Sequence, residues 1–427
     1  MGPRSRPALR AVESIVVPDP QHGRVLVLRD TQGITDAQAV IPPPLVPIVA
    51  RFTGRLSCED IAREVSGDGQ GEVPVEVVTR LAAELDRGLF LEGPTFRAAR
   101  ARVEGDFAAA TTRPASHAGG AYFAERRALE RYIDGSCLAK ARATHGNGDH
   151  HASGTHVNGT HAGGGSLLAL VAPHIDPWRG AVGYGHAYNA LAASLPADAD
   201  TFVIFGTSHA PMARPFALCR KAFDTPLGPV DADGDALDTI AACATFDPYA
   251  DQFNHKREHS LEFQVVFLKH LLKGRPFRIV PILAGLGQQQ ASGTDPAGDA
   301  AIRAFADGVR TLVEGRPGKV VVVAGADMAH VGPRFGDAAP YDEAQRAALE
   351  KADRASLELA ASLDVQGFWS HVAADLDERR VCGLAPIWSL LHSVAGSGAH
   401  GKVLHYEQTI DADDGSIVSH AAVGFYG

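Results

Sequence analysis

Histidine follows three apolar stretches of the chain that have the character of buried β-strands. The first stretch, LLALVAPHID, ends in His174 and Asp176, and the second, VIFGTSHAP, leads into His209. The third, VVVVAGADMAHVG, carries Asp327 and His330 after four consecutive valines. Ligands of α/β sheets gather beyond the carboxyl ends of the strands, so we expect the three histidines and Asp327 to meet in one crevice.

A cysteine precedes a further apolar helix in the segment RRVCGLAPIWSLLHSV. Cys382 stands there before a turn at Gly383 and the start of the expected helix. Backbone amides at a helix N-terminus favour the thiolate, which makes a cysteine a better nucleophile and a better metal ligand. The alternative is a buried cysteine that packs as a small hydrophobic side chain. Position alone leaves both interpretations open.

The pentapeptide HKREH, from His255 to His259, matches the His-x-x-Glu-His pattern of inverted zinc peptidases. That pattern needs both histidines on one face of a helix. An apolar helical stripe begins only after Ser260, so we expect the helix to begin near Glu258 and to exclude His255. The local sequence therefore argues against a peptidase.

The chain after residue 166 alternates apolar runs with helical stretches. Continuous apolar strands that alternate with helices are typical of a sheet covered on both faces. We therefore predict an α/β domain over residues 106–427, with a central mixed sheet whose strand directions become mixed near the end. The expected strands are SLLALVAP, TFVIFGTS, FRIVPILAG, KVVVVAGAD, KVLHYEQTI and IVSHAAVGFYG, and the expected helices include AVGYGHAYNALAASL, HSLEFQVVFLKHLLKG and YDEAQRAALEKADRASLELAASL.

Residues 1–105 are predicted to form a separate small α+β domain that resembles a winged helix. Two short strands lie within residues 12–30, and helical segments follow at 43–52, 57–66 and 73–88. The third helix carries more acidic than basic side chains, which is unfavourable for contacts with DNA phosphates. We therefore favour a docking module for a protein or peptide over a DNA-binding domain. Its shape also resembles the small peptide-binding chaperone domains of peptide-modification pathways.

Residues 141–166 form a tract rich in glycine, histidine, threonine and asparagine that lacks periodicity. Such a composition buries too little apolar surface to fold alone, so we expect a flexible insertion. Histidine-rich tracts also bind transition metals loosely, which is a second interpretation. The histidines of the tract are His145, His150, His151, His156 and His161.

Composition and charge are those of an ordinary folded protein of 427 residues with a formal net charge of −10. Apolar residues make up 45% and charged residues 21%, which argues against global disorder. The acidic balance argues against general binding to nucleic acid or anionic lipid. Without an apolar run of roughly 18 residues or a signal peptide, we expect no membrane association and a cytoplasmic protein. The five cysteines lack paired spacing and are expected to be reduced thiols.

Seven motifs follow one another along the C-terminal domain, namely PHID, GTSHA, DTPLGPVD, EHSLEFQ, FRIVPILAG, ADMAHVG and VCGLAPI. In this order they resemble the Memo family, specifically the bacterial form called AmmeMemoRadiSam system protein B, from about Ser116 to the C-terminus. The resemblance implies a fold related to the class III extradiol dioxygenases and a mononuclear site with iron or copper redox chemistry. It also implies a radical S-adenosylmethionine protein and an AMMECR-type domain protein as partners.

The resemblance further implies which residues form the site. Each of them is placed by its position within one of the quoted motifs. The family's metal ligands correspond to His174, His209 and Cys382, with Asp327 and His330 beside them and with Glu258 and His259 lining the pocket.

One departure from the family concerns the residues after His174. Many members have Ala-Gly-Tyr there, whereas this chain has Ile-Asp-Pro-Trp at residues 175–178. The added carboxylate of Asp176 is a candidate to join the metal ligands or to hold a substrate amine. We assign Asp176 and Glu258 to substrate binding.

The ligand types indicate the chemistry of the site. Two imidazoles and a thiolate suit iron(II), copper or zinc, whereas Mg²⁺ and Ca²⁺ prefer oxygen ligands. We expect iron(II), with copper or zinc as alternatives, and open positions for substrate or O₂. His330 is then the general acid or base, Asp327 orients it or a bound water, and His259 completes the catalytic residues.

Three functions remain open on these grounds. The first is an iron-dependent oxidase or oxygenase that acts on a small molecule or on a peptide or protein side chain. The second is a non-enzymatic protein that keeps the pocket to bind a ligand or a partner. The third is a zinc-dependent hydrolase. Neither the substrate nor the oligomeric state follows from the sequence.

Overall fold

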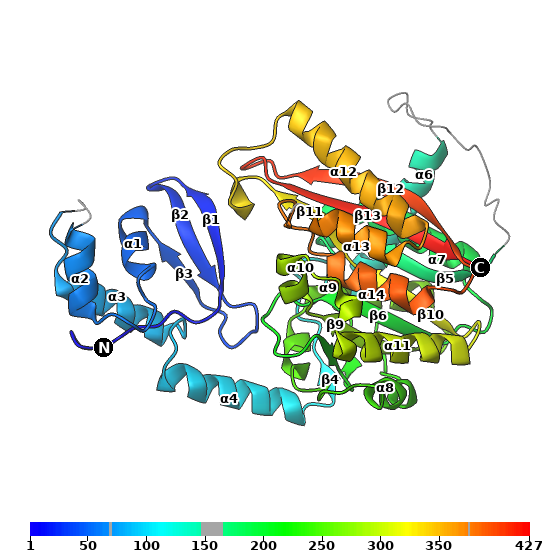
Figure 1. Ribbon diagram of the computed structural model, residues 1–427, viewed down its shortest axis with the longest axis horizontal. Coiled ribbons are helices and arrows are strands. Elements are labelled where there is room, and N and C mark those ends of the chain that lie inside the picture. The colour runs from blue at the N-terminus through cyan, green and yellow to red at the C-terminus, as the bar shows by residue number, and fades with distance from the viewer. Residues whose placement is uncertain (68–70, 147–164, 375) are drawn as a thin grey trace. The chain divides into compact units, whose positions relative to one another are not determined.

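The computed structural model of the chain describes four stretches of residues, and Figure 1 draws the remainder as a thin grey trace. Most of the predicted histidine-rich insertion lies outside the described residues. Within them, no helix combines the length and the hydropathy that crossing a membrane requires. The described stretches are residues 1–67, 71–146, 165–374 and 376–427.

The chain forms two compact units, of which unit 1 comprises residues 1–110, 332–339 and 412–414. Its main elements are β1 (Glu13–Asp19), β2 (Gly23–Arg29), β3 (Gln38–Ile41), a 3₁₀ helix (Pro43–Leu45), α1 (Val46–Val49), α2 (Cys58–Gly67), α3 (Val75–Arg87) and α4 (Pro94–Ala109). The strands form an antiparallel sheet in the order β1-β2-β3. Residues of β2, β3, α1, α2 and α3 share one hydrophobic core, so unit 1 is an α+β body.

The helices α2 and α3 lie where the sequence predicts them. α3 begins after Pro74 and ends at Gly88, the two residues expected to delimit it. The β1–β2 hairpin also matches the expected pair of strands, whereas β3 and α4 were not predicted. The predicted domain boundary at residue 105 falls within α4. The winged-helix interpretation of unit 1 stays a prediction.

Unit 2 contains the remaining residues and is built on one large sheet. Its strands are β4 (Thr112–Arg113), β5 (Leu167–Ala172), β6 (Thr201–Thr207), β7 (Phe216–Leu218), β8 (Ala222–Phe223), β9 (Arg278–Ala284), β10 (Val320–Gly325), β11 (Asp327–Val331), β12 (His400–Ile410) and β13 (Ile417–Tyr426). Eight of them form a sheet in the order β11-β13-β5-β10-β6-β9-β7, with β12 paired to β13. In this sheet β5, β10, β6 and β9 run parallel, whereas β7, β11, β12 and β13 are antiparallel to their neighbours. The predicted mixed sheet is confirmed.

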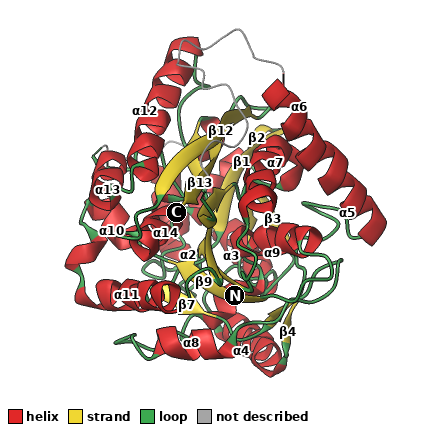
Figure 2. Cartoon of the chain, turned by 90° about the vertical axis from the view of Figure 1, so that its right-hand side faces the viewer, coloured by secondary structure: helices red, strands yellow, loops and turns green. Residues whose placement is uncertain are grey.

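Helices cover both faces of this sheet (Figure 2). They are α5 (Arg126–Tyr132), a π-helical turn (Ile133–Ala139), α6 (Lys140–Gly146), α7 (Pro177–Ser194), α8 (Gly234–Ala241), α9 (His259–Leu271), α10 (Gly287–Ser292), α11 (Ala300–Gly315), α12 (Glu343–Ala361), α13 (Val365–Ala373) and α14 (Leu384–Val394). In β10, Val322 and Ala324 pack with residues of α11 and α14, whereas Val321 and Val323 pack with residues of α7 and α9. Alternate side chains of β10 thus pack into the hydrophobic cores on opposite faces of the sheet, which explains the unbroken apolar sequence of this strand.

Two glycines let separate segments approach the carboxyl edge of the parallel strands. A Cβ atom at Gly325, the last residue of β10, would collide with the carbonyl oxygen of Ser260 at the start of α9. A Cβ atom at Gly383 would collide with the carbonyl oxygen of Asp327, to which the Gly383 amide donates at 3.0 Å. The beginnings of α9 and α14 are therefore held against the same edge of the sheet.

Candidate metal centre

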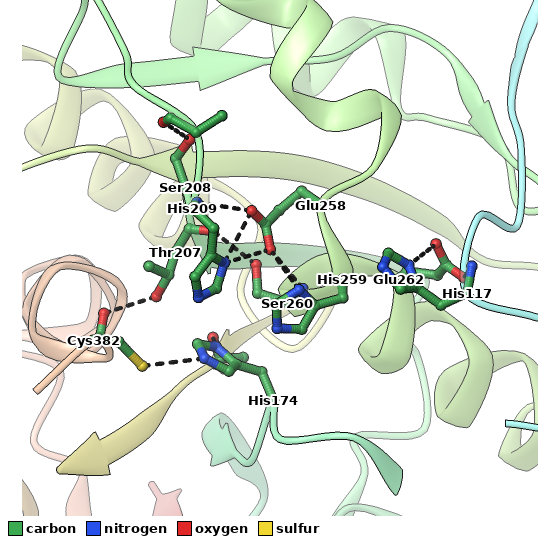
Figure 3. Close-up of polar contacts among 12 residues, drawn as sticks. His117, His174, Thr207, Ser208, His209, Glu258, His259, Ser260, Glu262 and Cys382 are labelled. Atoms are coloured by element: carbon green, nitrogen blue, oxygen red, sulfur yellow. Dashed lines mark hydrogen bonds and ion pairs between the residues drawn. The ribbon is translucent and has the colours of Figure 1, made fainter. Parts of the chain in front are cut away.

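Three side chains with metal-binding atoms meet at this edge (Figure 3). His174 follows β5, His209 follows β6, and Cys382 comes just before α14. The Sγ atom of Cys382 lies 3.1 Å from Nε2 of His174, and the ligand atoms of all three residues lie within 4.8 Å of one another. Ligands that share one tetrahedral ion at usual bond lengths are separated by roughly 3.5 Å. The three residues are therefore spaced as candidate ligands of a single ion.

The two imidazoles are held in the same way. Nδ1 of His174 lies 2.9 Å from the carbonyl oxygen of Gly325, and Nδ1 of His209 lies 3.0 Å from the carboxylate of Glu258. A carbonyl oxygen and a carboxylate only accept, so Nδ1 carries the proton in each ring and donates it. The lone pair of each ring is then on Nε2. Metal-binding histidines typically show this arrangement, because the outer hydrogen bond fixes the tautomer and the direction of the ring.

Glu258 aligns His209 from the N-cap position of α9. Its carboxylate accepts from the backbone amides of His209 at 2.9 Å and Ser260 at 3.0 Å. Burial alone would raise the pKa of Glu258, but the interactions with His209 and the nearby His259 together outweigh burial and hold the pKa well below the usual range. Glu258 is therefore an anion behind a candidate ligand. Its predicted role in substrate binding stays a prediction.

The protonation of the site without a cation is dominated by burial. Burial, with His209 acting in the same direction, lowers the pKa of His174 to about 4, so its ring is neutral near pH 7. Burial, reinforced by Asp327, raises the pKa of the Cys382 thiol well above its usual range. This direction is opposite to the one expected from the helix N-terminus, because desolvation outweighs the backbone amides. A coordinated cation would reverse it, since metal-bound thiols are deprotonated.

Asp327 and His330 of β11 lie beside these ligands, as expected. The Asp327 carboxylate accepts from the backbone amide of His174 at 2.8 Å, and its other oxygen lies 3.7 Å from Nε2 of the same histidine. The backbone amide of His330 donates to the carbonyl oxygen of Arg379 at 2.8 Å. Burial lowers the pKa of His330 to about 4, although the nearby Asp327 acts in the opposite direction. His330 is therefore neutral near pH 7.

His259 faces the same cluster from the first turn of α9. Its ring centroid lies 4.6 Å from that of His209 and 5.3 Å from that of His174. Burial lowers the pKa of His259 well below its ordinary value. His209, Glu258 and His259 form a second group whose ligand atoms lie within 4.8 Å of one another. Because the two groups share His209, they belong to one site.

Asp176 has a different position. It is the N-cap of α7, where its carboxylate accepts from the backbone amide of Arg179 at 3.2 Å and pairs with Nε of the same residue at 2.5 Å. Among the described residues, neither group of candidate ligands includes Asp176. Its contacts thus explain why an acidic residue stands at the start of this helix, and its predicted role in substrate binding stays a prediction.

His255 is separated from His259 by a change of helix type. It lies in a 3₁₀ helix, Gln252–Lys256, and α9 begins only at His259. The His255 side chain is fully buried, with Nε2 3.0 Å from the carbonyl oxygen of Ala217. The two histidines therefore do not form the pair that an inverted zinc peptidase needs, as expected from the sequence.

Sequence reasoning missed a buried ion pair between Arg113 and Glu262. Their side chains are 0% and 1% exposed, and 149 residues separate them along the chain. A pair so distant in sequence leaves no local pattern. The available signal was a glutamate inside the otherwise apolar helix SLEFQVVFL, where an unpaired charge would be costly.

Comparisons with known proteins give consistent matches. Residues 113–424 match the protein-family model described as Memo-like protein. A protein of Aquifex aeolicus (strain VF5) named MEMO1 family protein is 23% identical over 406 residues, which cover 95% of this chain and 97% of its own. Proteins of the same name from Methanosarcina mazei and Archaeoglobus fulgidus are 28% and 29% identical, over 60% and 61% of this chain and 85% and 87% of theirs.

Among solved structures, the uncharacterized protein JW3007 from Escherichia coli K12 aligns with a TM-score of 0.37 and 15% sequence identity. The alignment covers 61% of this chain and 100% of that protein.

Proposed function

The chain belongs to the Memo family, and we propose that it binds one transition-metal ion through His174, His209 and Cys382. Iron(II) is the first choice, with copper or zinc as alternatives, because imidazole and thiolate ligands suit these ions. The strongest support is the pair of Nδ1 hydrogen bonds, to Gly325 and Glu258, because they leave the Nε2 lone pair of each histidine available for an ion.

The proposed activity is that of an oxidase or oxygenase acting on a small molecule or on a side chain within a peptide, protein or RNA modification system. A redox-active ion held by these ligands would supply electron transfer and a positive charge near the substrate. His330 would accept or return the proton that the reaction moves, because its ring is neutral near pH 7. Asp327 would orient His330 or a water molecule, and His259 would close the pocket on the side of α9.

A non-enzymatic role as a ligand-binding or partner-binding protein is the second candidate. The observation that favours it is that the family match begins at residue 113, whereas residues 1–110 form most of a compact unit of their own. Unit 1 would then dock a peptide or a partner, and a radical S-adenosylmethionine protein and an AMMECR-type protein are the candidates from the family. A zinc-dependent hydrolase is a third candidate, because the same ligands suit Zn²⁺.

Metal content tests the proposal directly. Elemental mass spectrometry would be performed on untagged protein that lacks residues 147–164, so that the histidines of that segment contribute nothing. We expect about one iron or copper per chain, retained in Cys243→Ala, which alters an exposed cysteine, and lost in Cys382→Ala. Absence of metal after anaerobic loading with Fe(II) or Cu(I) would reject the metal site and favour the binding protein. O₂ uptake with Fe(II) would support the oxidase, and activity with Zn²⁺ alone the hydrolase.

A further inference from the structure

A buried arginine near the start of unit 2 contacts the N-terminal end of α9. The guanidinium of Arg113 is fully buried and donates to the carbonyl oxygens of His255 at 2.8 Å and Glu258 at 2.7 Å. It also forms the ion pair with Glu262 in the first turn of α9. Arg113 therefore holds the chain on both sides of the point where the helix begins.

The partner of Arg113 is fully engaged as well. The Glu262 carboxylate accepts from the backbone amides of Ser116 at 3.1 Å and His117 at 2.9 Å, and from the hydroxyl of Tyr122. Figure 3 shows Glu262 and His117 on the far side of His259 from Cys382. Burial alone would raise the pKa of Glu262, but Arg113 together with His117 and Tyr122 outweighs burial and holds the pKa at about 2. Arg113 and Glu262 therefore form a buried, charged and extensively hydrogen-bonded pair that supports the start of α9.

Glu258 links this support to the candidate metal ligands. Its backbone carbonyl accepts from Arg113, while its carboxylate accepts from the amide and the Nδ1 of His209. A planar guanidinium can hold two carbonyl oxygens and a carboxylate at once, in fixed directions. A lysine ammonium in the same place could keep the charge but not all of these contacts.

We propose that Arg113 is a positioning residue of the metal centre, which sets the direction of the His209 imidazole by fixing Glu258 at the start of α9. The inference rests on the proposed metal function. A positioning role of Arg113 differs from a purely structural role in one measurable respect. A structural role lowers the stability of the fold, whereas a positioning role also changes the affinity and the ligand geometry of the metal that the folded protein binds.

Arg275 offers a matched control within unit 2. Its guanidinium donates to the carbonyl oxygens of Pro196 at 3.1 Å, Ala197 at 2.6 Å and Ala199 at 2.5 Å. These residues precede β6, at the amino ends of the parallel strands and thus opposite the metal centre. Arg275→Lys therefore removes a similar set of arginine–carbonyl contacts without touching the candidate ligands.

The experiment is a titration of the full chain with Co²⁺, monitored by its visible spectrum and above all by its thiolate charge-transfer band, to which residues 147–164 cannot contribute because they contain no cysteine. We expect Arg113→Lys to weaken Co²⁺ binding about 10- to 100-fold per folded molecule, the usual effect of losing an outer contact, and to shift the spectrum. Arg275→Lys should keep the wild-type affinity and spectrum even where it lowers the melting temperature.

Wild-type affinity and spectrum in Arg113→Lys would overturn the inference while leaving the proposed function intact. Failure of the wild-type protein to bind Co²⁺ would instead overturn the proposed function and the inference with it. If Arg113→Lys does not fold, Tyr122→Phe replaces it, because it removes only one hydrogen bond to Glu262. A smaller shift in the same direction would support the inference, and an unchanged spectrum and affinity would overturn it.

Discussion

Glu258 holds His209 through two hydrogen bonds, one from the backbone amide at 2.9 Å and one from Nδ1 at 3.0 Å. The backbone contact fixes where the residue lies, and the ring contact fixes which nitrogen faces the candidate metal. Because Glu258 is buried and ionised, the contact to the ring is a charge-assisted hydrogen bond.

Glu258→Gln should therefore weaken metal binding without removing any ligand. An uncharged amide makes a weaker bond to Nδ1 and can also present its NH₂ group to the ring. We expect a loss of affinity of about 10- to 100-fold, measured by competition with a chromophoric Zn²⁺ chelator. Glu407→Gln is the control, because Glu407 contacts His405 at 3.2 Å and neither belongs to the candidate ligands. Equal affinities for Glu258→Gln and wild type would contradict this role.

His330→Ala separates proton transfer from metal binding. His330 lies outside both groups of candidate ligands, so the variant should retain its metal content within error. If His330 acts as the general acid or base, turnover should fall about 10²- to 10⁴-fold, measured as O₂ uptake by Fe(II)-loaded protein. Loss of the metal in this variant would make His330 a ligand and would contradict the assigned role.

His255 should make the fold sensitive to acid. Burial lowers its pKa from 6.5 to about 4, so the unfolded chain binds the proton more readily than the folded one. The contribution of His255 to the free energy of unfolding is therefore fully present above pH 6.5. It is lost as the pH falls toward 4, at about 1.4 kcal/mol per pH unit. The free energy of unfolding of His255→Gln, measured in urea, should therefore change less steeply with pH between 6.5 and 4. The difference in slope should correspond to the uptake of one proton fewer on unfolding. An unchanged slope would count against this assignment.

Asp353 should be among the residues most important for the stability of unit 2. Its side chain is 0% exposed, pairs with Arg379 at 3.0 Å, and accepts from Ser419 at 2.6 Å and Tyr406 at 3.0 Å. Asp353→Asn removes the negative charge from this buried ion pair, which costs about 3–5 kcal/mol. Glu350→Gln in the same helix should cost less than about 1 kcal/mol. Calorimetric melting of both variants measures the difference.

The ligands that follow strands were predictable because local pattern and topology agree. Apolar runs identify β5 and β6, and parallel strands of one sheet end at the same edge, so His174 and His209 were expected on that edge, where only β10 separates their strands. Cys382 was predictable as the start of a helix but not in its protonation, since the burial that raises its pKa depends on distant segments.

The contacts behind the ligands could not be predicted in the same way. Glu258 belongs to a recognisable motif, yet its contact with His209 spans 49 residues of sequence. Asp176 follows a strand just as His174 does, but the competing need for a cap on α7 engages its carboxylate. His330 follows the valine strand β10, as expected, but it belongs to a further strand, β11, whose pairing with β13 is not visible locally. Sequence patterns report each segment's own preferences, whereas these roles arise from non-local packing.

The strand β5 has a practical consequence for protein engineering. The described residues resume at residue 165, just before β5, and His174 follows the other end of this strand. Six strand residues span about 20 Å at the usual rise per residue. A fluorophore, affinity handle or surface linker inserted in place of residues 147–164 would thus attach a strand's length away from the candidate ligands. The fold therefore provides an attachment point where the protein can be labelled or immobilised while its metal chemistry is observed separately.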